Sequence, residues 1–599
     1  MGNPFCPVQG EARVGSDARL WPCLAVRFMP LPFAPGAEPL TLRQLTGATP
    51  GFEAVVVGSG ATGGVAAMVL AEAGMRVLVL EAGPALTARQ AFPGEPLNLV
   101  RRLANLASGR QRLQANHPGY WKHNPRLYVD ERRHPYSTPA DAPFLWTRGR
   151  QLGGRSLTWG GITLRLSDYE FQAARRDGHG RAWPIGLADL APYYSRLERL
   201  FGIHGQADGL PQLPDGEYEA PLPFTPAERH LKTCVERRLG LPLIHSRGFR
   251  LHHANASHSW PRSSSPGVTL ARAQASGRVS LCCDAVVSHL QMAPGGGRAE
   301  GVVVVDAARG CQELLRAELV VLCASTLETL RILLHSSEAV RPGGLIDPSG
   351  CLGTGLMDHV SCARFFSLPA VPEPSEPQEL SGAGSCFIPN TLNLSGDEGL
   401  GFRRGYGLWT AVQRFDPPRW LKRRPQEALG FLIGHGEVLA DPANRIQLDF
   451  SRGDAHGLPL PQIACRWGSN EQAMVRHMQA RMAAVVAAAG GELLPLEELV
   501  KLPLVEPWLR HSPALAAAAA PPGYYVHELG GAPMSLRPDD GVLNAWNQCW
   551  RAANVLVGDG ASWPSAGWQS PTLTSMALTW RACEAAVRML RGGSLTSAS

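Results

Sequence analysis

Apolar runs and amphipathic segments alternate along the chain and predict strands that are followed by helices. A predicted strand over residues 53–57, apolar from Ala54 onward, leads through a glycine-rich turn into a helical pattern over 62–73 and a second predicted strand over 76–80, apolar from Val77 onward. Unbroken apolar runs of this length are typical of strands that are buried on both faces of a parallel sheet. The same strand-then-helix order returns at 318–335 and at 554–590. These three stretches therefore predict parts of one α/β unit.

The pattern between these stretches is more varied. After a basic, proline-containing stretch, residues 187–201 carry apolar side chains at helical spacing, and 278–284 and 301–306 predict two strands. Over residues 369–522 the pattern changes to short alternating strands and proline-rich turns, with one helix predicted over 470–488. We therefore expect a separate region of mixed α+β structure on the substrate side.

The length of the chain supports a division into regions. A chain of 599 residues with 44% hydrophobic residues is too long for a single core. The predicted regions are an N-terminal extension at 1–50, a cofactor-binding region at 51–368 with substrate-side elements inserted around 165–260, a substrate-binding region at 369–522, and a return to the cofactor-binding region at 523–592. The extension is rich in proline and glycine, so we expect it to be disordered or to precede a true start at Met29.

The first predicted turn carries the strongest chemical signal. Gly58, Gly60 and Gly63 have the spacing GxGxxG between a buried strand and a helix. In that context the first glycine allows a tight turn, the second lets the backbone approach a pyrophosphate, and the third permits close packing of helix on strand. Glu81 ends the second strand, where its carboxylate can accept a hydrogen bond from a ribose 2′-hydroxyl and excludes a 2′-phosphate. We therefore predict a dinucleotide site, and its position near the N-terminus favours FAD over NAD.

The net charge argues against a nucleic-acid partner. A net charge of +6 is small for this length, and it comes from local clusters such as Arg101-Arg102 and Lys422-Arg423-Arg424. Such clusters are typical of solvated faces, whereas a nucleic-acid surface needs a denser basic stripe with interleaved aromatic residues. A docking face for a redox partner or a membrane subunit stays open for the cluster at 419–424.

Other classes are excluded by what the sequence lacks. No apolar run approaches the ~20 residues that span a bilayer, and the N-terminus has no basic start followed by an apolar core. The 13 cysteines form no CxxC pair, which indicates reduced thiols rather than a disulfide framework or a zinc site. We therefore predict a cytoplasmic protein that binds no metal and contacts a membrane only peripherally, if at all. Export together with a partner subunit stays open.

Six motifs make the chain resemble the glucose-methanol-choline (GMC) family of FAD-dependent oxidoreductases. In chain order they are Gly58-x-Gly60-x-x-Gly63, Gly149-Arg150-x-Leu152-Gly153-Gly154-x-Ser156, Trp183-Pro184-Ile185 with Asp189-Leu190-Ala191-Pro192-Tyr193-Tyr194, Leu356-Met357-Asp358-His359, His527-Glu528-Leu529-Gly530-Gly531, and Asp559-Gly560 through Pro571-Thr572-Leu573-Thr574. The resemblance runs from about residue 52 to residue 590. It implies a Rossmann-like FAD-binding domain joined to a mixed-sheet α+β substrate-binding domain, in a p-hydroxybenzoate-hydroxylase-like arrangement. The segments at 204–213 and 434–437 look most like the sugar and glucoside dehydrogenase branch.

The resemblance also implies where the cofactor lies. Carried over position by position, the expected cofactor-binding residues are Gly58, Gly60, Gly63 and Glu81 for the adenosine diphosphate half, Arg150, Gly153, Gly154 and Ser156 for the middle, and Asp559, Gly560 and Thr572 for the ribityl and flavin half. Some relatives attach FAD covalently through a histidine two residues after the position of Ser156. Thr158 stands there in this chain, so we predict non-covalent FAD.

One catalytic position follows the family and another departs from it. His527 occupies the family's catalytic position, where a histidine takes the hydroxyl proton while the carbinol C–H delivers hydride to flavin N5. A second histidine or asparagine normally precedes the Pro-Thr of the last helix, but Ser570 stands here and is also the expected N-cap of that helix. Its shorter side chain predicts a weaker second donor. The open outcomes are slower chemistry, a substrate repositioned against Gln569, or no turnover.

The resemblance implies a FAD-dependent enzyme that oxidises a CH–OH group, expected in a sugar, glycoside or polyol secondary alcohol. The electrons must then pass to an external acceptor, which is a quinone, a redox protein or oxygen, and the branch resemblance favours a dehydrogenase over an oxidase. Two alternatives stay open. One is a flavoprotein that binds FAD with little or no alcohol turnover, and the other is a family member that acts on a non-sugar alcohol.

Overall fold

The computed structural model describes residues 39–47, 51–252, 259–306, 309–369, 371–415, 417–501 and 518–593. Most of the predicted N-terminal extension therefore lies outside the described residues. Its described part contains the short helix α1 (Leu42–Gly47) and a bridge from Leu40 to Cys282.

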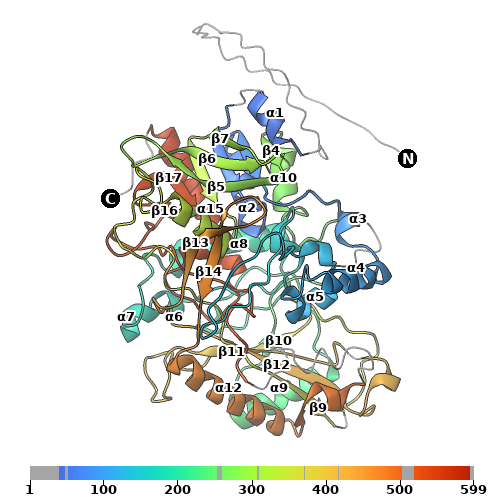
Figure 1. Ribbon diagram of the computed structural model, residues 1–599. Helices are drawn as coiled ribbons and strands as arrows, with labels where there is room; N and C mark the ends of the chain where they lie inside the picture. The colour runs from blue at the N-terminus through green and yellow to red at the C-terminus, as the bar shows by residue number, and fades with distance from the viewer. Residues whose placement is uncertain are drawn as a thin grey trace, which may run out of the picture. The chain divides into compact units, whose positions relative to one another are not determined.

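A six-stranded sheet carries the predicted α/β unit (Figure 1). Its strand order is β16 (Gln548–Cys549), β17 (Ala552–Val557), β8 (Leu319–Leu322), β1 (Ala54–Val57), β2 (Val77–Leu80) and β4 (Val279–Cys282). All neighbours are parallel except β16 and β17. The strands β1, β2 and β8 are buried at every position, as their unbroken apolar runs predict. The predicted α/β unit is therefore confirmed, with strands from all three stretches.

Helices and two small sheets surround this unit. The helix α2 (Ala61–Glu72) packs against α10 (Thr269–Ala275) and α15 (Thr572–Arg591), and α15 also packs against α8 (Leu187–Phe201). On the other side α11 (Thr326–Ser336) packs on β5. The small sheets are β5 (Ala285–Met292), β6 (Ala299–Asp306) and β7 (Gln312–Arg316), and the pair β13 (Arg445–Gly453) and β14 (Pro459–Ala464).

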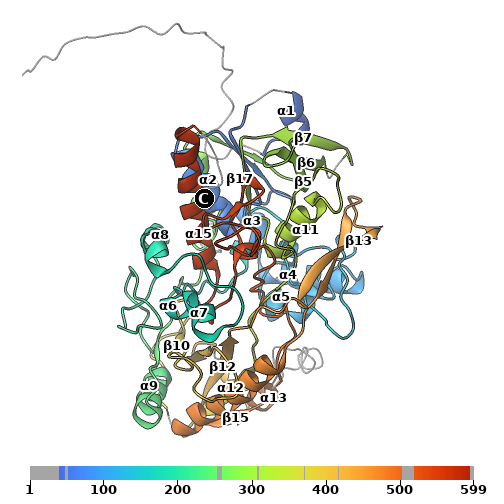
Figure 2. The ribbon, with the colours of Figure 1, turned by 90° about the vertical axis from the view of Figure 1, so that its left-hand side faces the viewer.

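The second large sheet is antiparallel and has helices on one side, as Figure 2 shows. Its order is β15 (Glu492–Leu494), β9 (Ala363–Leu368), β12 (Ala428–Gly436), β11 (Tyr406–Val412), β10 (Cys386–Ile388) and β3 (Ile244–His245). The helices α12 (Ser469–Ala488) and α9 (Pro226–Leu239) cover it. A Cβ on Gly434 would lie 1.8 Å from the sulfur of Met478, so this glycine allows α12 to approach β12 closely. Strands β3 and β9 join this sheet although they lie before residue 369.

Shorter elements connect these layers. The basic stretch after β2 folds into α3 (Ala88–Ala91), α4 (Glu95–Ala107), η1 (Gln114–Asn116), α5 (Pro118–Lys122) and η2 (Pro125–Leu127), which the hydrophobic pattern did not predict. The others are η3 (Gly154–Leu157), α6 (Asp168–Phe171), α7 (Ala173–Asp177), η5 (Arg419–Leu421), α13 (Leu496–Leu499) and η7 (Gly560–Ser562). Among the described residues, no helix has both the length and the hydropathy needed to cross a bilayer.

The predicted cap of the last helix is wrong. Helix α15 begins at Thr572, and its N-cap residue is Pro571 rather than Ser570, with helical dihedral angles and no side-chain cap. Within the described residues, the first N–H groups of this helix have no side chain as their acceptor.

Candidate active site

Two of the three glycines in the first turn are required by packing within the chain. Gly58 has φ +99°, and a Cβ there would lie 2.3 Å from the carbonyl oxygen of Cys323 at the end of β8. A Cβ on Gly63 would lie 2.0 Å from the carbonyl oxygen of Gly58. Gly60 is different, because its φ is −68° and a Cβ there would meet no protein atom within 4 Å. The chain itself does not require glycine at position 60, which fits the close approach of a bound phosphate at the start of α2.

The second glycine-rich loop lies directly against the first. The N–H of Gly153 donates to the Oγ of Ser59 at 2.9 Å, and that hydroxyl donates to the Oε2 of Glu81 at 2.5 Å. A Cβ on Gly154, which has φ +51°, would lie 3.5 Å from the Cα of Gly60. The two loops and the end of β2 therefore form one cradle, and they bring together the residues that the sequence predicts for the first half of the cofactor.

Ser156 holds the second loop in place. Its hydroxyl donates to the carbonyl oxygen of Gly153 at 2.6 Å and accepts from the N–H of Ser265 at 3.0 Å. Both bonds are buried, so they fix the loop rather than compete with water. Ser156 therefore shapes the cradle through the backbone. Thr158 lies two residues further on, and its hydroxyl donates to the carbonyl oxygen of Arg155 at 3.4 Å.

The carboxylate of Glu81 is buried at the end of β2. It accepts from Ser59 on Oε2 and from the N–H of Gly83 on Oε1 at 2.9 Å. Burial raises the pKa of Glu81, and these hydrogen bonds oppose that effect. Each carboxylate oxygen can accept two hydrogen bonds, so Oε1 has capacity for one more donor. This arrangement fits the predicted contact with a ribose hydroxyl.

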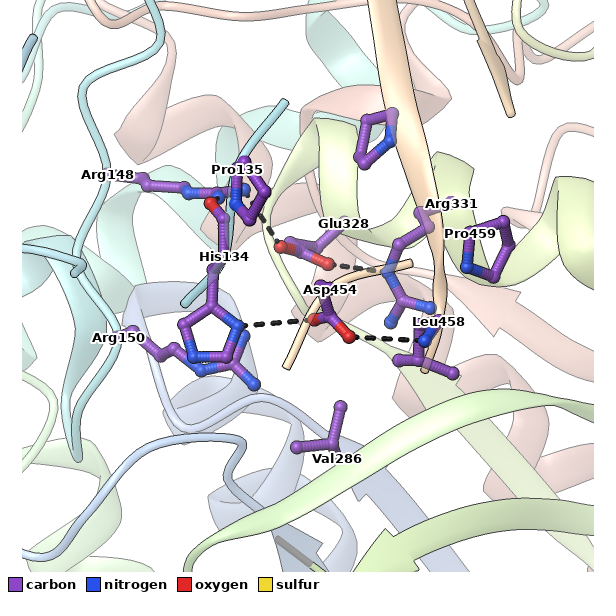
Figure 3. A pocket seen from close by; sticks show the side chains of 11 residues that line it. His134, Pro135, Arg148, Arg150, Val286, Glu328, Arg331, Asp454, Leu458 and Pro459 are labelled. Carbon is purple, nitrogen blue, oxygen red and sulfur yellow. Dashed lines mark hydrogen bonds and ion pairs between the residues drawn. The ribbon is translucent and has the colours of Figure 1, made fainter. Parts of the chain in front are cut away.

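Arg150 extends into a small charged pocket (Figure 3). Arg148 and Arg331 lie 3.2 and 2.8 Å from the carboxylate of Glu328, and Asp454 contacts His134 at 3.2 Å. Burial alone would raise the pKa of Glu328, but the surrounding arginines outweigh it and lower that pKa to about 2. One guanidinium nitrogen of Arg150 is buried and has no hydrogen-bond partner among the described residues. Its predicted role toward the cofactor stays a prediction.

The Asp559-Gly560 motif joins the C-terminal strand to the catalytic segment. Asp559 follows β17, and its Oδ2 accepts from the hydroxyl of Thr329 at 2.6 Å. A Cβ on Gly560 would lie 2.6 Å from the carbonyl oxygen of Glu528, the residue after His527. The N–H of Gly530 donates to the carbonyl oxygen of Gly560 at 2.9 Å. The motifs at 527–531 and 559–560 therefore lie side by side, and Thr572 begins the helix that follows.

His527 belongs to a cluster of aromatic side chains. The ring centroids of His359 and Tyr525 lie 4.9 and 5.0 Å from that of His527, and the centroid of His435 lies 6.5 Å away. These residues come from the 356–359 motif, from strand β12 and from the 523–531 loop. His359 and His435 are buried, whereas Tyr525 and His527 are partly exposed. We call the four residues the histidine cluster.

A buried carboxylate positions the backbone beneath the cluster. Asp358 accepts hydrogen bonds from the backbone N–H groups of Tyr525 at 3.2 Å, His527 at 3.0 Å and His359 at 2.8 Å. Burial, together with Glu528, raises the pKa of Asp358 to about 7. One side chain thus holds the two segments that carry His359 and His527 in a fixed relation.

The hydrogen bonds of the cluster determine which nitrogen of His527 carries its proton. His359 Nε2 lies 2.7 Å from the carbonyl oxygen of Gly567, which can only accept, so this nitrogen carries a proton. Burial lowers the pKa of His359 to about 4, so the ring is neutral and its Nδ1 is an acceptor. The Nδ1 of His527 lies 2.8 Å away and must therefore be the donor. Burial, reinforced by His359 and His435, also holds the pKa of His527 well below its usual range. The Nε2 of His527 is consequently an unprotonated base.

Tyr525 and His435 form a second polar pair in the cluster. The Tyr525 hydroxyl and the Nε2 of His435 are in hydrogen-bond contact, and burial raises the pKa of this phenol well above its usual range. The other ring nitrogen of His435 is buried and has no partner among the described residues. The rings of Phe387 and Trp409 lie around His435, with centroids 5.4 and 6.4 Å away.

The backbone beside His527 is strained. Val526 has φ +65°, a conformation that is rare for a β-branched residue. Its carbonyl oxygen accepts from Arg155 Nη1 at 3.1 Å, and Arg155 Nη2 lies 2.7 Å from a carboxylate oxygen of Glu528. Strain of this kind costs about 1–3 kcal/mol and persists where neighbours fix the chain, often at functional sites. The sequence did not reveal Arg155 or Val526 as part of the site.

The structure does not bring Ser570 into hydrogen-bond contact with His527. Ser570 is buried, and its hydroxyl makes no hydrogen bond to any residue in the described part of the chain. Gln569 lies near Glu170, whose pKa is raised by burial, but neither amide atom of Gln569 has a hydrogen-bond partner in the described part of the chain. The neighbour that does contact His527 is His359, which the sequence showed only as part of a motif without a role.

Comparisons with known proteins agree with this architecture. The chain matches the family model for GMC oxidoreductase over residues 440–579 and the model for an NAD(P)-binding Rossmann-like domain over residues 56–106. It is 25% identical to 2-methyl-1,2-propanediol dehydrogenase of Mycolicibacterium austroafricanum, over 88% of this chain and 94% of that protein. It is 22% identical to the fructose dehydrogenase large subunit of Gluconobacter japonicus, over 90% of this chain and 98% of that protein.

Two further similarities extend these matches. The chain is 26% identical to 6'''-hydroxyparomomycin C oxidase of Streptomyces lividus, over 93% of this chain and 94% of that protein. Among solved structures, pyridoxine 4-oxidase from Mesorbium loti superposes with a TM-score of 0.56 at 19% identity, covering 89% of this chain and 99% of that one. At this identity the structural likeness supports the fold alone.

Proposed function

The chain belongs to the GMC family of FAD-dependent oxidoreductases, which act on CH–OH groups, and we propose that it oxidises a secondary alcohol of a sugar, glycoside or polyol with His527 as the base. The observation that carries this proposal is the hydrogen-bond chain from the Gly567 carbonyl through His359 to His527. It supports a neutral imidazole with its Nε2 lone pair available at neutral pH.

Different residues of the chain would bind the cofactor and remove the substrate proton. FAD, when bound, supplies the hydride acceptor at N5, and the cradle of Gly58, Gly60, Gly63 and Glu81 would hold its adenosine diphosphate half. His527 Nε2 takes the hydroxyl proton as the carbinol C–H leaves as hydride, so the alcohol loses one proton and one hydride and becomes a carbonyl. The positive charge that develops on His527 is shared with His359 through the Nδ1–H bond.

Tyr525 is our candidate for the second group that holds the substrate oxygen. Its ring lies 5.0 Å from that of His527, and its phenol stays protonated because burial raises its pKa. When His435 donates its Nε2–H to the phenol oxygen, the phenol O–H is available to the substrate. This assignment leaves Ser570 as the weaker donor that its sequence position suggests.

The proposed substrate class follows from the polar groups of the cluster. The imidazole of His527 and the phenol of Tyr525 can contact two oxygens of a compound with several hydroxyl groups, whereas a purely aliphatic alcohol would leave one of them unpaired. The relatives include 2-methyl-1,2-propanediol dehydrogenase, the fructose dehydrogenase large subunit and 6'''-hydroxyparomomycin C oxidase. Both observations favour a polyhydroxylated substrate over a hydrocarbon-like one.

The decisive experiment is anaerobic mixing of the purified flavoprotein with a panel of sugars, glycosides, polyols and simple alcohols. We expect a polyhydroxylated member to bleach the flavin absorbance, and the same compound to bleach a His527→Ala variant more slowly by about 10²–10⁴-fold, with the flavin still bound. Failure of the whole panel to bleach the wild type would support the alternative, a flavoprotein without alcohol turnover. Equal rates in both proteins would remove His527 from the role of base.

Two finer expectations belong to the same proposal. Thr158 stands where a covalent histidine would be needed, so acid precipitation should release the flavin into the supernatant, and a yellow pellet would contradict this. We also favour transfer of the electrons to a quinone or a redox protein. Oxygen uptake that matches substrate oxidation one for one would instead identify an oxidase.

A further inference from the structure

Helix α4 has its polar and apolar faces reversed. A helix on the surface of a protein in water normally packs its apolar stripe inward and turns its polar face outward. In α4 the buried side chains are Asn98 and Arg102, while Leu97, Val100 and Leu103 are 47%, 65% and 57% exposed. These three residues follow at intervals of three and form one outward stripe, which Leu99 extends at 48% exposure. We call this stripe the α4 face.

Polar contacts hold the helix in this orientation. Arg102 donates from Nε to the carbonyl oxygen of Tyr120 at 3.1 Å and from Nη2 to that of His123 at 2.9 Å, and it pairs with Glu95. Asn105 donates to the side chain of Gln111 at 2.7 Å. The helix is thus tied to α5 by its polar side, so the outward position of the leucines is built into the fold.

The α4 face is unusual within this molecule. Of the ten large apolar side chains that are exposed in the described part of the chain, five lie in residues 97–113. Single exposed apolar residues are normal on a protein surface, whereas a contiguous group marks an interaction site. Figure 1 shows α4 at one edge of the described chain, with α5 beside it and away from both large sheets.

Exposed basic side chains at the C-terminal end of α4 indicate the charge of its partner. Residues 85–135 contain nine lysines and arginines against three acidic residues, an excess equal to the net charge of the whole chain. Arg112 donates to the carbonyl oxygen of Leu106 at 3.4 Å, and Arg132 to that of Ser108 at 3.3 Å, so both lie at the C-terminal end of α4. Pairing with a second copy of the chain would bring two such surfaces of like charge together, which is unfavourable. An apolar stripe flanked by positive charge instead suits an anionic lipid surface.

The same segment contributes to the wall of the active site. The ring of His117, the residue before α5, lies 5.5 Å from that of Tyr524, next to Tyr525 of the histidine cluster. Tyr120 of α5 packs in one apolar group with Leu157, which lies in the second glycine-rich loop. A surface that binds at α4 would therefore lie next to the segment that encloses the predicted flavin end.

We propose that the α4 face docks the protein onto an anionic lipid bilayer, with the leucine stripe in the interface and the nearby arginines at the headgroups. The inference rests on the reversed helix and its charge, and it stands independently of the reaction that the site performs. The proposal concerns a bilayer surface rather than a span.

Vesicle flotation of the full-length flavoprotein tests this proposal. We expect it to float with vesicles of phosphatidylcholine and phosphatidylglycerol, to bind pure phosphatidylcholine vesicles much less, and to lose binding as salt is raised. A Leu97→Ser/Val100→Ser/Leu103→Ser variant should lose at least about tenfold in partitioning. An Arg112→Gln/Arg132→Gln variant should lose about 10–10²-fold, because each basic residue near the surface contributes about one decade or less.

Matched controls distinguish docking from a general loss of apolar surface. Ile346 and Leu536 are 45% and 64% exposed outside the α4 face, so an Ile346→Ser/Leu536→Ser variant should float like the wild type. Thermal unfolding and the flavin spectrum should be unchanged in all variants, because none of these side chains lies in the core. Absence of flotation by the wild type would overturn the proposal, and so would equal flotation of the α4 variant. Dimerisation in solution that depends on the same leucines would assign the face to a second copy instead.

Discussion

The cofactor cradle and the histidine cluster are built in opposite ways. In the cradle, the critical residues are glycines whose hydrogen atoms leave room for backbone, as at Gly63, where a Cβ would lie 2.0 Å from a carbonyl oxygen. In the histidine cluster the side chains themselves are the site, and His359 and His527 meet across 168 residues of sequence. The cradle therefore depends on backbone geometry, whereas the histidine cluster depends on which ring nitrogens carry protons.

The largest effects on stability and FAD binding should come from alanine substitutions of two glycines in the cradle, one required by packing and one not. Gly63→Ala forces Cβ against backbone and should cost the apoprotein about 3 kcal/mol or more and prevent FAD binding. Gly60→Ala has free space and an ordinary φ of −68°, so it should leave apoprotein stability within about 1 kcal/mol while it weakens FAD binding at least about tenfold. Urea unfolding of the apoproteins and titration with FAD would measure both. Unimpaired FAD affinity in Gly60→Ala would contradict the pyrophosphate assignment.

The next largest effect should come from the hydrogen bond between His359 and His527, which sets the tautomer of His527. His359→Phe removes the acceptor for the His527 Nδ1–H, so the ring can adopt the wrong tautomer, and the rate of flavin bleaching at saturating substrate should fall about 10²-fold. His359→Gln can accept from His527 with its amide oxygen and donate to Gly567 with its nitrogen, so it should recover part of that loss. A merely structural role would give similar losses in both variants. The flavin spectrum and the thermal midpoint serve as controls.

A smaller change in bleaching rate should show whether Tyr525 or Ser570 is the second hydrogen-bond donor to the substrate oxygen. Tyr525→Phe removes a phenol within the cluster and should slow bleaching by about 10–10²-fold, whereas Ser570→Ala removes a hydroxyl with no partner among the described residues and should cost less than about tenfold. Pre-steady-state bleaching rates for the two variants would decide between them. The reverse order would return the role to Ser570.

The smallest effect is expected from pH. The pKa of His527 lies well below its usual range because the site desolvates most of the ring and His359 and His435 oppose a positive charge there, and its unprotonated form is the active one. The bleaching rate should therefore be high above that pKa, change less than about twofold between about pH 6 and pH 8, and fall only in more acidic solution. A tenfold fall per pH unit beginning near 6.5 would contradict the depressed pKa. A shallow step near pH 7 would instead report Asp358, whose pKa burial raises to about 7.

The α4 face and the basic cluster at 419–424 show that the number of basic residues in a segment does not by itself identify a docking face. Arg419 pairs with Glu373 at 2.6 Å and Arg424 with Glu492 at 2.7 Å, so distant acidic residues neutralise much of that cluster. Around α4, Arg102 pairs with Glu95 and Arg110 with Asp130, but the side chains of Arg112 and Arg132 donate to backbone carbonyl oxygens and form no ion pair in the described part of the chain. The sequence left the cluster at 419–424 open as a docking face, whereas the exposed leucines favour the α4 face.

The hydrophobic pattern and the glycine motif alone predict the α/β unit and the cradle. Gly58, Gly60, Gly63 and Glu81 lie within 24 residues and have the spacing that recurs wherever a strand, a tight turn and a helix bind a dinucleotide. It also identified His527, through a motif resemblance. Local patterns carry such information because their contacts are close in sequence.

Which groups meet His527 depends on how distant segments pack together. The family pattern expects Ser570 to hold the same substrate oxygen, which stays a prediction, and chain folding brings His359, His435 and Tyr525 close to the ring of His527. The protonation of His527 depends on the carbonyl of Gly567, 40 residues further along the chain. The outward stripe of α4 was likewise hidden, because hydrophobic spacing predicts a helix with two faces but not which face is turned to water. Contacts between segments far apart in the chain have no signature in local spacing, so these features emerge only when the chain is folded.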